Sequence, residues 1–150
     1  MANLNENVLE MRDKNIGRLF QRVARAYSER AVKLLRERGF NDITLSHTAL
    51  IANLDVGGTR ITTLADRAGM TKQAMGQLAK ELEEKGYTER VEDTSDKRAS
   101  LIRFTELGKD ALHAAYEAKL TIEAEYAGLL GEKEVAQLRN QLEKLADAVG

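Results

Sequence analysis

The sequence contains no cysteine, proline or tryptophan and only two histidines. Without cysteine, disulfides, thiolate metal ligands and thiol-based redox switches are all excluded. Two histidines are too few for a convincing metal site of their own, so we expect no metal. The sequence also has no Ser/His/Asp elbow, phosphate-binding loop or cluster of metal ligands. We therefore expect neither a cofactor nor an enzyme with catalytic residues.

Long hydrophobic runs are also missing. Residues 1–6 lack the apolar stretch of a signal peptide, and no later stretch is apolar enough to span a bilayer. A cytoplasmic location without membrane contact is therefore the expectation. Hydrophobic residues nevertheless make up 43% of the 150 residues, which is enough for the core of one domain, with or without dimerisation arms.

The charges are unevenly distributed, although the net charge of −1 gives no global support to nucleic-acid binding. Residues 10–39 carry nine Lys or Arg and four Asp or Glu, which gives +5, whereas residues 105–150 carry five and nine, which gives −4. Two interpretations stay open. Either the two regions pack together, within one chain or across a dimer, or their helices have ordinary solvated faces.

Apolar residues at helical spacing predict long helices at both ends of the chain. The first covers residues 15–38 and ends at Gly39, a left-handed C-cap. Another runs from Glu106 to a break at Gly131, and a last helix follows it. Because a small central module offers too little surface to bury all these apolar stripes, we expect a helical dimer interface. A monomer with a helical bundle beside the module is the alternative.

The central segment Thr62–Phe104 has the order helix, tight turn, helix and hairpin. Thr62 or Thr63 is expected to cap its first helix, and Thr71 to cap the second helix, residues 72–85. The hairpin is predicted from two stretches of alternating polar and apolar residues around a seven-residue polar loop, Thr88–Glu92 and Ser100–Phe104.

This order predicts a mainly α fold with a small β wing. Residues 41–105 would form a winged helix-turn-helix domain that binds DNA, and the flanking residues 1–40 and 106–150 would form a helical dimerisation region.

The second helix of the central segment has the features of a DNA-recognition helix. Such a helix enters the major groove, so its outer face must carry hydrogen-bond donors, and acids must be absent near the phosphates. Residues 68–80 contain no Asp or Glu, and Gln can pair with adenine while Lys reaches guanine or phosphate. The candidate DNA-binding residues here are Thr71, Lys72, Gln73, Gln77 and Lys80. The alternative is an ordinary amphipathic helix with a solvated polar face.

The tip of the hairpin supplies further candidates. Lys97 and Arg98 suit phosphate contact and insertion into the minor groove, because narrow minor grooves attract arginine. Asp96 beside them is expected to orient the Arg98 guanidinium, to bond its own backbone as a turn residue, or both. Arg90, at the foot of the hairpin, is a candidate phosphate contact or an exposed strand residue.

Taken together, these segments resemble the MarR family of transcriptional regulators. The resemblance rests on residues 64–75 and 82–87 in the helix-turn-helix, on residues 96–99 at the wing tip, and on residues 104–108. The last two pieces match the family's Asp-x-Arg wing tip and Thr-x-x-Gly helix entry. The resemblance implies a homodimer that binds a palindromic operator, usually as a repressor, and is often relieved by a small aromatic or anionic ligand.

The resemblance also implies roles for single residues. The family's recognition-helix contacts fall on Thr71, Lys72, Gln73 and Gln77, and its wing pair falls on Asp96 and Arg98. The chain departs from the family at Gly76, where Ser or Thr is frequent, and at Gln77, where Arg is frequent. The operator sequence therefore cannot be carried over from the family.

A ligand site is harder to predict than the DNA site. Four residues with polar tips on apolar bodies are candidates for a pocket between the helical arms and the DNA-binding module: Tyr27, His47, His113 and Tyr116. Each is also explained as a packed or interfacial residue, and His47 as part of a helix cap.

The predicted function is sequence-specific binding of double-stranded DNA by a ligand-responsive homodimer. The alternative is a winged-helix module that binds another protein and not DNA.

Overall fold

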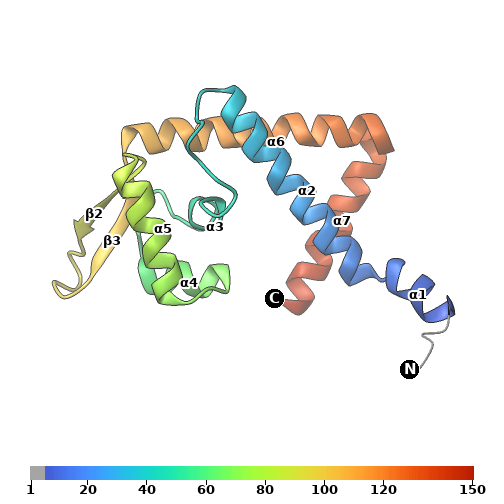
Figure 1. Ribbon diagram of the computed structural model, residues 1–150, viewed down its shortest axis with the longest axis horizontal. Coiled ribbons are helices and arrows are strands. Elements are labelled where there is room, and N and C mark those ends of the chain that lie inside the picture. Colours follow the sequence, from blue (N-terminus) through green and yellow to red (C-terminus); the bar gives the residue numbers. More distant parts are fainter. Residues whose placement is uncertain (1–5) are drawn as a thin grey trace.

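A computed structural model describes residues 6–150, which form seven helices and a three-stranded sheet (Figure 1). The elements in chain order are α1 Glu6–Asp13, α2 Ile16–Glu37, α3 Thr48–Ile51, β1 Thr59–Arg60, α4 Ile61–Ala68, α5 Lys72–Glu84, β2 Thr88–Glu92, β3 Ser100–Phe104, α6 Glu106–Leu130 and α7 Glu132–Val149. The predicted mainly α fold with a small β wing is confirmed. Residues 1–5, on which part of the signal-peptide expectation rests, lie outside the described range.

The first long helix, α2, ends at the predicted signal, Gly39, and its start is set by an Asn15 cap that was not predicted. The Asn15 side chain accepts a hydrogen bond from the backbone N–H of Arg18 (3.3 Å), and this cap separates α2 from α1. At the other end, Gly39 has a φ of 98°, and the backbone N–H of Phe40 donates to the carbonyl of Leu35 (3.0 Å). Glycine therefore supplies the left-handed backbone that ends the helix.

The predicted threonine cap of α4, the first helix of the helix-turn-helix, is wrong. Helix α4 begins at Ile61, before Thr62 and Thr63, and its N-cap position is Arg60, whose side chain makes no capping hydrogen bond. Strand β1 runs directly into α4, and Arg60 is paired with Leu101 of β3. The sheet pairing therefore sets the start of this helix instead of a threonine cap.

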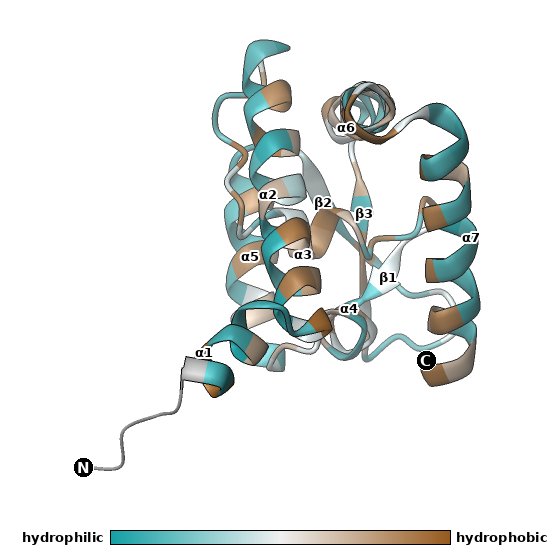
Figure 2. Ribbon diagram, turned by 90° about the vertical axis from the view of Figure 1, so that its right-hand side faces the viewer, coloured by the Kyte–Doolittle hydropathy of each residue, from teal (hydrophilic) through white to brown (hydrophobic). Residues whose placement is uncertain are grey.

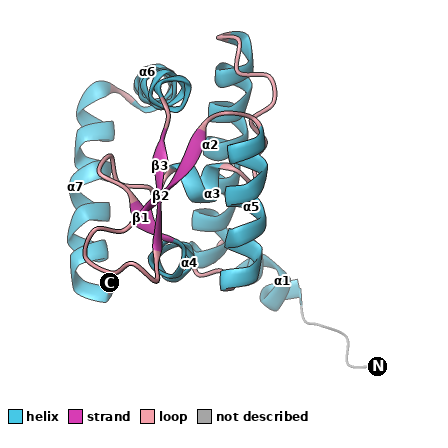
Figure 3. Ribbon diagram, turned by 90° about the vertical axis from the view of Figure 1, so that its left-hand side faces the viewer, coloured by secondary structure: helices cyan, strands magenta, loops and turns pink. Residues whose placement is uncertain are grey.

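The sheet has the strand order β1-β3-β2 and is antiparallel throughout. Its three strands are drawn in magenta in Figure 3. Strands β2 and β3 form the predicted hairpin, in which Thr88 lies opposite Phe104 and Glu92 opposite Ser100. The short β1 covers the other edge of β3, so the hairpin is tied to the helix-turn-helix and does not project alone.

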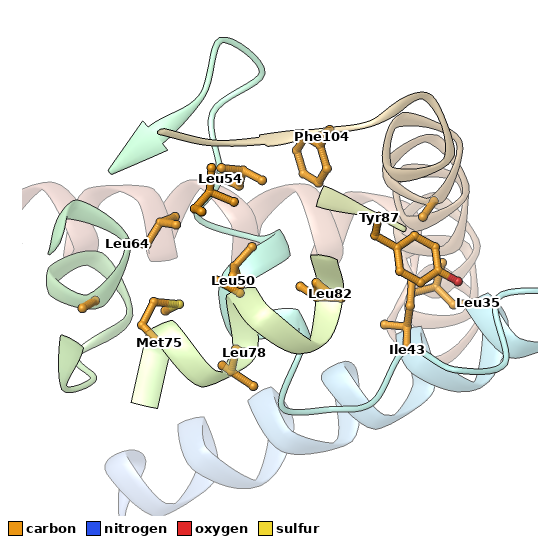
Figure 4. Close-up of a cluster of buried hydrophobic side chains, with 14 of the residues drawn as sticks. Leu35, Ile43, Leu50, Leu54, Leu64, Met75, Leu78, Leu82, Tyr87 and Phe104 are labelled. Carbon is orange, nitrogen blue, oxygen red and sulfur yellow. The ribbon is translucent and has the colours of Figure 1, made fainter. Parts of the chain in front are cut away.

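The main core lies between the helix-turn-helix, the sheet and the start of α6 (Figure 4). Its central side chains are apolar and fully buried, and they come from four elements: Leu50, Leu64, Met75, Leu82 and Ile102. Burying a side chain of this size contributes about 1.5–3 kcal/mol each, which is an upper estimate because the unfolded chain is itself partly compact. This core holds α4 and α5 at a defined angle beneath α3.

The long helices that flank the central module, α2 on one side and α6 and α7 on the other, are called the arms. Of these, α2 and α6 contact each other within one chain. Arg30 of α2 donates to Glu125 of α6 (Nε to Oε1, 3.2 Å), and Arg38 lies 3.7 Å from Glu117. A small core of Leu34, Ala118 and Ile122 packs between the same helices. The basic region 10–39 and the acidic region 105–150 therefore do form ion pairs with each other within one chain. Exposed ion pairs of this kind contribute at most about 1 kcal/mol each, so apolar packing dominates.

Much of the apolar surface of the arms is uncovered. No residue of α7 is buried, and its apolar residues recur along one side of the helix ribbon, the side toward the rest of the molecule in Figure 2. The exposed large apolar residues of α2 and α7 are Ile16, Leu19, Phe20, Val23, Leu138, Leu142, Leu145 and Val149. Within the described residues, no helix combines the length and the apolar character that crossing a membrane requires.

The entry into α6 shows why glycine occupies position 108. Thr105 caps the helix by accepting from the backbone N–H of Gly108 (3.1 Å), and its hydroxyl donates to the carbonyl of Gly86. A Cβ at Gly108 would lie 1.9 Å from the carbonyl oxygen of Tyr87. The wing strands and α6 can approach this closely only because the side chain is absent.

Gly108→Ala should therefore destabilise the protein by about 1–3 kcal/mol, because the backbone must shift to accept the methyl group. Urea denaturation measures the change in free energy of unfolding. Gly76→Ala is the matched control, since a Cβ there would meet no atom within 4 Å. It should stabilise the helix by roughly 0.5–1 kcal/mol. Equal effects of the two substitutions would contradict this explanation.

Candidate nucleic-acid interface

Helix α5 buries one face and exposes the other. Thr71 caps it by accepting from the backbone N–H of Ala74 (3.1 Å). The residues that hold its inner face against the core are Met75, Leu78, Ala79 and Leu82. The predicted contact residues are all exposed on the remaining surface: Thr71, Lys72, Gln73, Gln77 and Lys80.

The wing lies beside α5 (Figure 1). An open concave notch of about 780 Å³ separates the hairpin from α5. Its walls carry four cationic side chains, Arg60, Lys72, Arg90 and Arg98, together with Gln73. Cations on both sides of a notch make it a favourable place for a polyanion backbone.

The cationic side chains of the notch and the wing tip fall into two groups. Some form ion pairs within the protein, and the others, called uncommitted below, form none that the structure describes. Arg60 is paired with Asp93, and the Nε of Arg90 donates to Glu83 of α5 (3.2 Å). By contrast, among the residues that the structure describes, no ion pair involves Lys72, Lys80, Lys97 or Arg98. The uncommitted cations lie on the outer face of α5 and at the wing tip, so they are available to an anionic partner.

The start of the wing loop is anchored by Asp93, which is 5% exposed. Its carboxylate accepts from the hydroxyl of Ser95 (2.7 Å), the backbone N–H of Ser95 (2.9 Å) and the Nε of Arg60 (2.7 Å). The hydrogen bonds from Ser95, followed by that from Arg60, lower the pKa of Asp93 to about 2. Burial acts against this shift, but the hydrogen bonds outweigh it.

Arg60 and Asp93 were not among the predicted site residues. The Asp-x-Ser order at the start of the loop is typical of an aspartate that bonds the backbone two residues later. No local pattern in the sequence, however, indicates the pairing with Arg60, which lies 33 residues away.

At the wing tip, the structure favours one of the two interpretations of Asp96. Its Oδ1 accepts from the backbone N–H of Arg98 (3.0 Å), which is the expected turn bond. Within the described residues, the guanidinium of Arg98 makes no hydrogen bond to Asp96. The carboxylate therefore shapes the turn that presents Lys97 and Arg98, both of which are exposed.

The candidate ligand residues separate into two groups. Tyr27 and Tyr116 line a cavity of about 710 Å³ between α2, α3 and α6. His47 lies elsewhere, fully buried beneath α5 and bonded to Thr44 and Glu81. His113 is exposed on α6, with its Nε2 3.4 Å from Glu117. Both histidines are therefore outside the cavity.

Two cationic side chains of the cavity wall were not predicted. Lys119 lies 4.9 Å above the ring of Tyr116, and Arg67 donates to Asp55 (3.0 Å). The remaining wall is mostly apolar. Among the described residues, no group of three or more His, Asp or Glu side chains is placed to hold a metal ion.

Comparisons with known proteins agree with this geometry. The model of the MarR family matches residues 41–99, and no curated protein matched the sequence. Among solved structures, wild-type MarR from E. coli without ligand is 22% identical and has a TM-score of 0.73, covering 88% of this chain and 96% of that one.

Two further structures are similar. MepR, a transcription regulator of the Staphylococcus aureus multidrug efflux pump MepA, is 21% identical with a TM-score of 0.67, covering 91% and 99% of the two chains. A MarR-family transcriptional regulator from Rhodococcus is 24% identical with a TM-score of 0.72, covering 89% and 94%. At these identities, the similarity to solved structures shows the fold.

Asp93→Asn should make the free energy of unfolding less dependent on pH in the acid range. The pKa of Asp93 lies below its ordinary value of about 3.9, so its bonds stabilise the fold above that value. This stabilisation is lost as the pH falls toward about 2. Urea midpoints measured from about pH 6 to about pH 2 should therefore fall less steeply in the variant. Equal slopes would contradict the anchoring role of this carboxylate.

Proposed function

We propose that this chain, a member of the MarR family by the match of residues 41–99, is a sequence-specific regulator that binds double-stranded DNA as a homodimer. The observation that carries the proposal is the exposed, donor-bearing face of α5 beside a wing tip with uncommitted cations. On this proposal, α5 enters the major groove and the wing reaches the adjacent minor groove. The function requires no catalytic step, cofactor or metal, and a cytoplasmic location stays a prediction.

Each candidate residue has a place in this docking. The N-terminus of α5 and Thr71 face a phosphate, because free backbone N–H groups at a helix start favour anions. Gln73 and Gln77 reach base edges, and Lys72 and Lys80 contact bases or phosphates. Lys97 and Arg98 follow the minor groove. Arg90 is bonded to Glu83 and so connects the wing to α5. It contacts a phosphate only if the phosphate displaces the Glu83 carboxylate.

The alternative function is a winged-helix module that binds a protein. The uncommitted cations favour DNA, and the salt dependence of binding separates the two. Phosphate contacts release condensed counterions, so DNA affinity falls steeply and linearly on a log–log plot as salt increases. A flat response would favour a protein partner.

The uncovered arms support a homodimer. The exposed apolar residues of α2 and α7 form faces that have no partner within the described chain, and such contiguous faces are typical of association sites. We therefore assign residues 1–40 and 106–150 to dimerisation and residues 41–105 to DNA binding. In a two-fold dimer, the two α5 helices would contact the two halves of a palindromic operator. Binding there would block transcription.

The cavity supports regulation by a small aromatic or anionic ligand. Tyr27 and Tyr116 offer aromatic surfaces with hydroxyl groups, and Lys119 offers a positive charge. The cavity lies between the arm helices α2 and α6 and the DNA-binding module. A ligand there would contact both parts and favour one arrangement of them, which relieves repression if that arrangement binds DNA poorly.

Arg98→Ala should weaken DNA binding by roughly 1–3 kcal/mol, or about 5- to 150-fold in Kd, because it removes the wing's minor-groove contact. Arg36→Ala is the matched control, since it removes the same charge from the far end of α2. Thermal stability and dimer formation should stay the same in both variants. Unchanged affinity of Arg98→Ala for selected duplexes would count against the proposed role of the wing.

Leu142→Glu should dissociate the dimer, because it places a charge in the apolar face of α7, where Leu142 is 43% exposed in the single chain. Sedimentation equilibrium measures the loss at concentrations where the unmodified protein is dimeric. Gln141→Glu, which changes an exposed neighbour on the same helix, should stay dimeric. A dimer that tolerates Leu142→Glu would place the interface elsewhere.

Benzoate tests the ligand proposal, with neutral benzamide as the comparison. Calorimetric titration should show tighter binding of benzoate, and Lys119→Gln should weaken benzoate by up to about fivefold while leaving benzamide unchanged. If the two probes bind equally, or if both are insensitive to Lys119, the cavity does not select aromatic anions.

A further inference from the structure

The side chain of Gln77, one of the candidate base contacts, is already bonded within the protein. Its Nε2 donates to the Oε1 of Glu81, one turn later on α5 (3.2 Å). A carboxylate can only accept hydrogen bonds, so the nitrogen and not the oxygen of the Gln77 amide must face Glu81. The bond to Glu81 therefore fixes the orientation of the Gln77 amide, with its nitrogen toward Glu81.

Glu81 is in turn held by a buried histidine beneath α5. The Nε2 of His47 lies 2.8 Å from the Oε2 of Glu81, and the His47 side chain is fully buried. The backbone N–H of Thr44 donates to the Nδ1 of His47 (3.0 Å). Because Nδ1 accepts, Nε2 carries the hydrogen and donates to Glu81. Every bond in the series Thr44, His47, Glu81 and Gln77 thus has a defined direction.

The series reaches from the core to the DNA-facing surface. His47 is buried and bonded through both ring nitrogens, whereas Glu81 and Gln77 lie at the surface, with the Glu81 side chain 38% exposed. The hydrogen bond from His47, and then that from Gln77, lowers the pKa of Glu81. Glu81 is therefore ionised, and both of its oxygens are occupied on the protein side.

We propose that Glu81, oriented by His47, is a positioning residue that determines base preference through Gln77. This inference rests on the proposed DNA-binding function and adds to it a residue that does not itself touch a base. With its nitrogen turned toward Glu81, Gln77 presents its carbonyl oxygen and its second N–H to the groove. This donor–acceptor pair is complementary to the N7 and N6 groups of adenine.

Replacing Glu81 by Gln reverses this arrangement. The new side chain must turn its carbonyl oxygen toward the N–H of His47, which leaves its NH₂ group facing Gln77. Gln77 then turns its own oxygen inward to accept, and presents its NH₂ group to the groove. Two donors are complementary to the O6 and N7 acceptors of guanine. The base preference should therefore change from adenine to guanine.

The test is selection of bound sequences from random duplexes with the full-length protein and with Glu81→Gln. At one position in each half-site, adenine should be preferred by the unmodified protein, and Glu81→Gln should change the adenine-to-guanine ratio on the order of tenfold. Glu84→Gln is the matched control, because it removes the same charge from the same helix. It should change affinity uniformly and leave the base preference at every position intact.

A second comparison keeps the test decisive if Glu81→Gln alters affinity for other reasons. In a Gln77→Ala background, Glu81→Gln should no longer change any base preference, because the amide through which it acts is gone. An effect of Glu81→Gln that persists without Gln77 would overturn the proposal, as would identical preferences of the unmodified protein and Glu81→Gln. If the unmodified protein enriches no sequence, the proposed function itself fails, and this inference fails with it.

Discussion

The burial of one face of α5 is the constraint on which the rest of the structure depends. Met75 and Leu82 are fully buried against α3, α4 and β3, so the helix cannot rotate about its axis without exposing them. The polar face is therefore turned outward at a defined angle. Because β1 continues directly into α4 and pairs with β3, the same core also places the wing.

Local signals explain most of what the sequence predicts correctly. The capping Thr71, the alternation in β2 and β3, and the Thr105–Gly108 entry are short-range patterns whose physical causes lie within a few residues. The exposed polar face of α5 could be predicted for the same reason, because helical periodicity separates the apolar and polar sides.

Pairings between distant residues could not be predicted from these patterns. Asp93 meets Arg60, and His47 meets Glu81, only after the chain has folded, 33 and 34 residues apart respectively. The sequence makes His47 a candidate for a ligand pocket, because a polar tip on an apolar body fits both a pocket and a packed position. Which of these it occupies depends on the placement of α3 against α5, and that placement is set by the core.

The arms give the DNA-binding module its proposed context. Helices α2 and α6 are joined within the chain, while the apolar faces of α2 and α7 stay uncovered, so a second copy is the simplest cover for them. The most direct test of a dimeric DNA reader is selection of bound sequences from random duplexes, analysed for two-fold symmetry. The account predicts a palindrome whose half-sites lie about one helical turn apart. Enrichment of a single unrepeated half-site, or of no sequence, would contradict it.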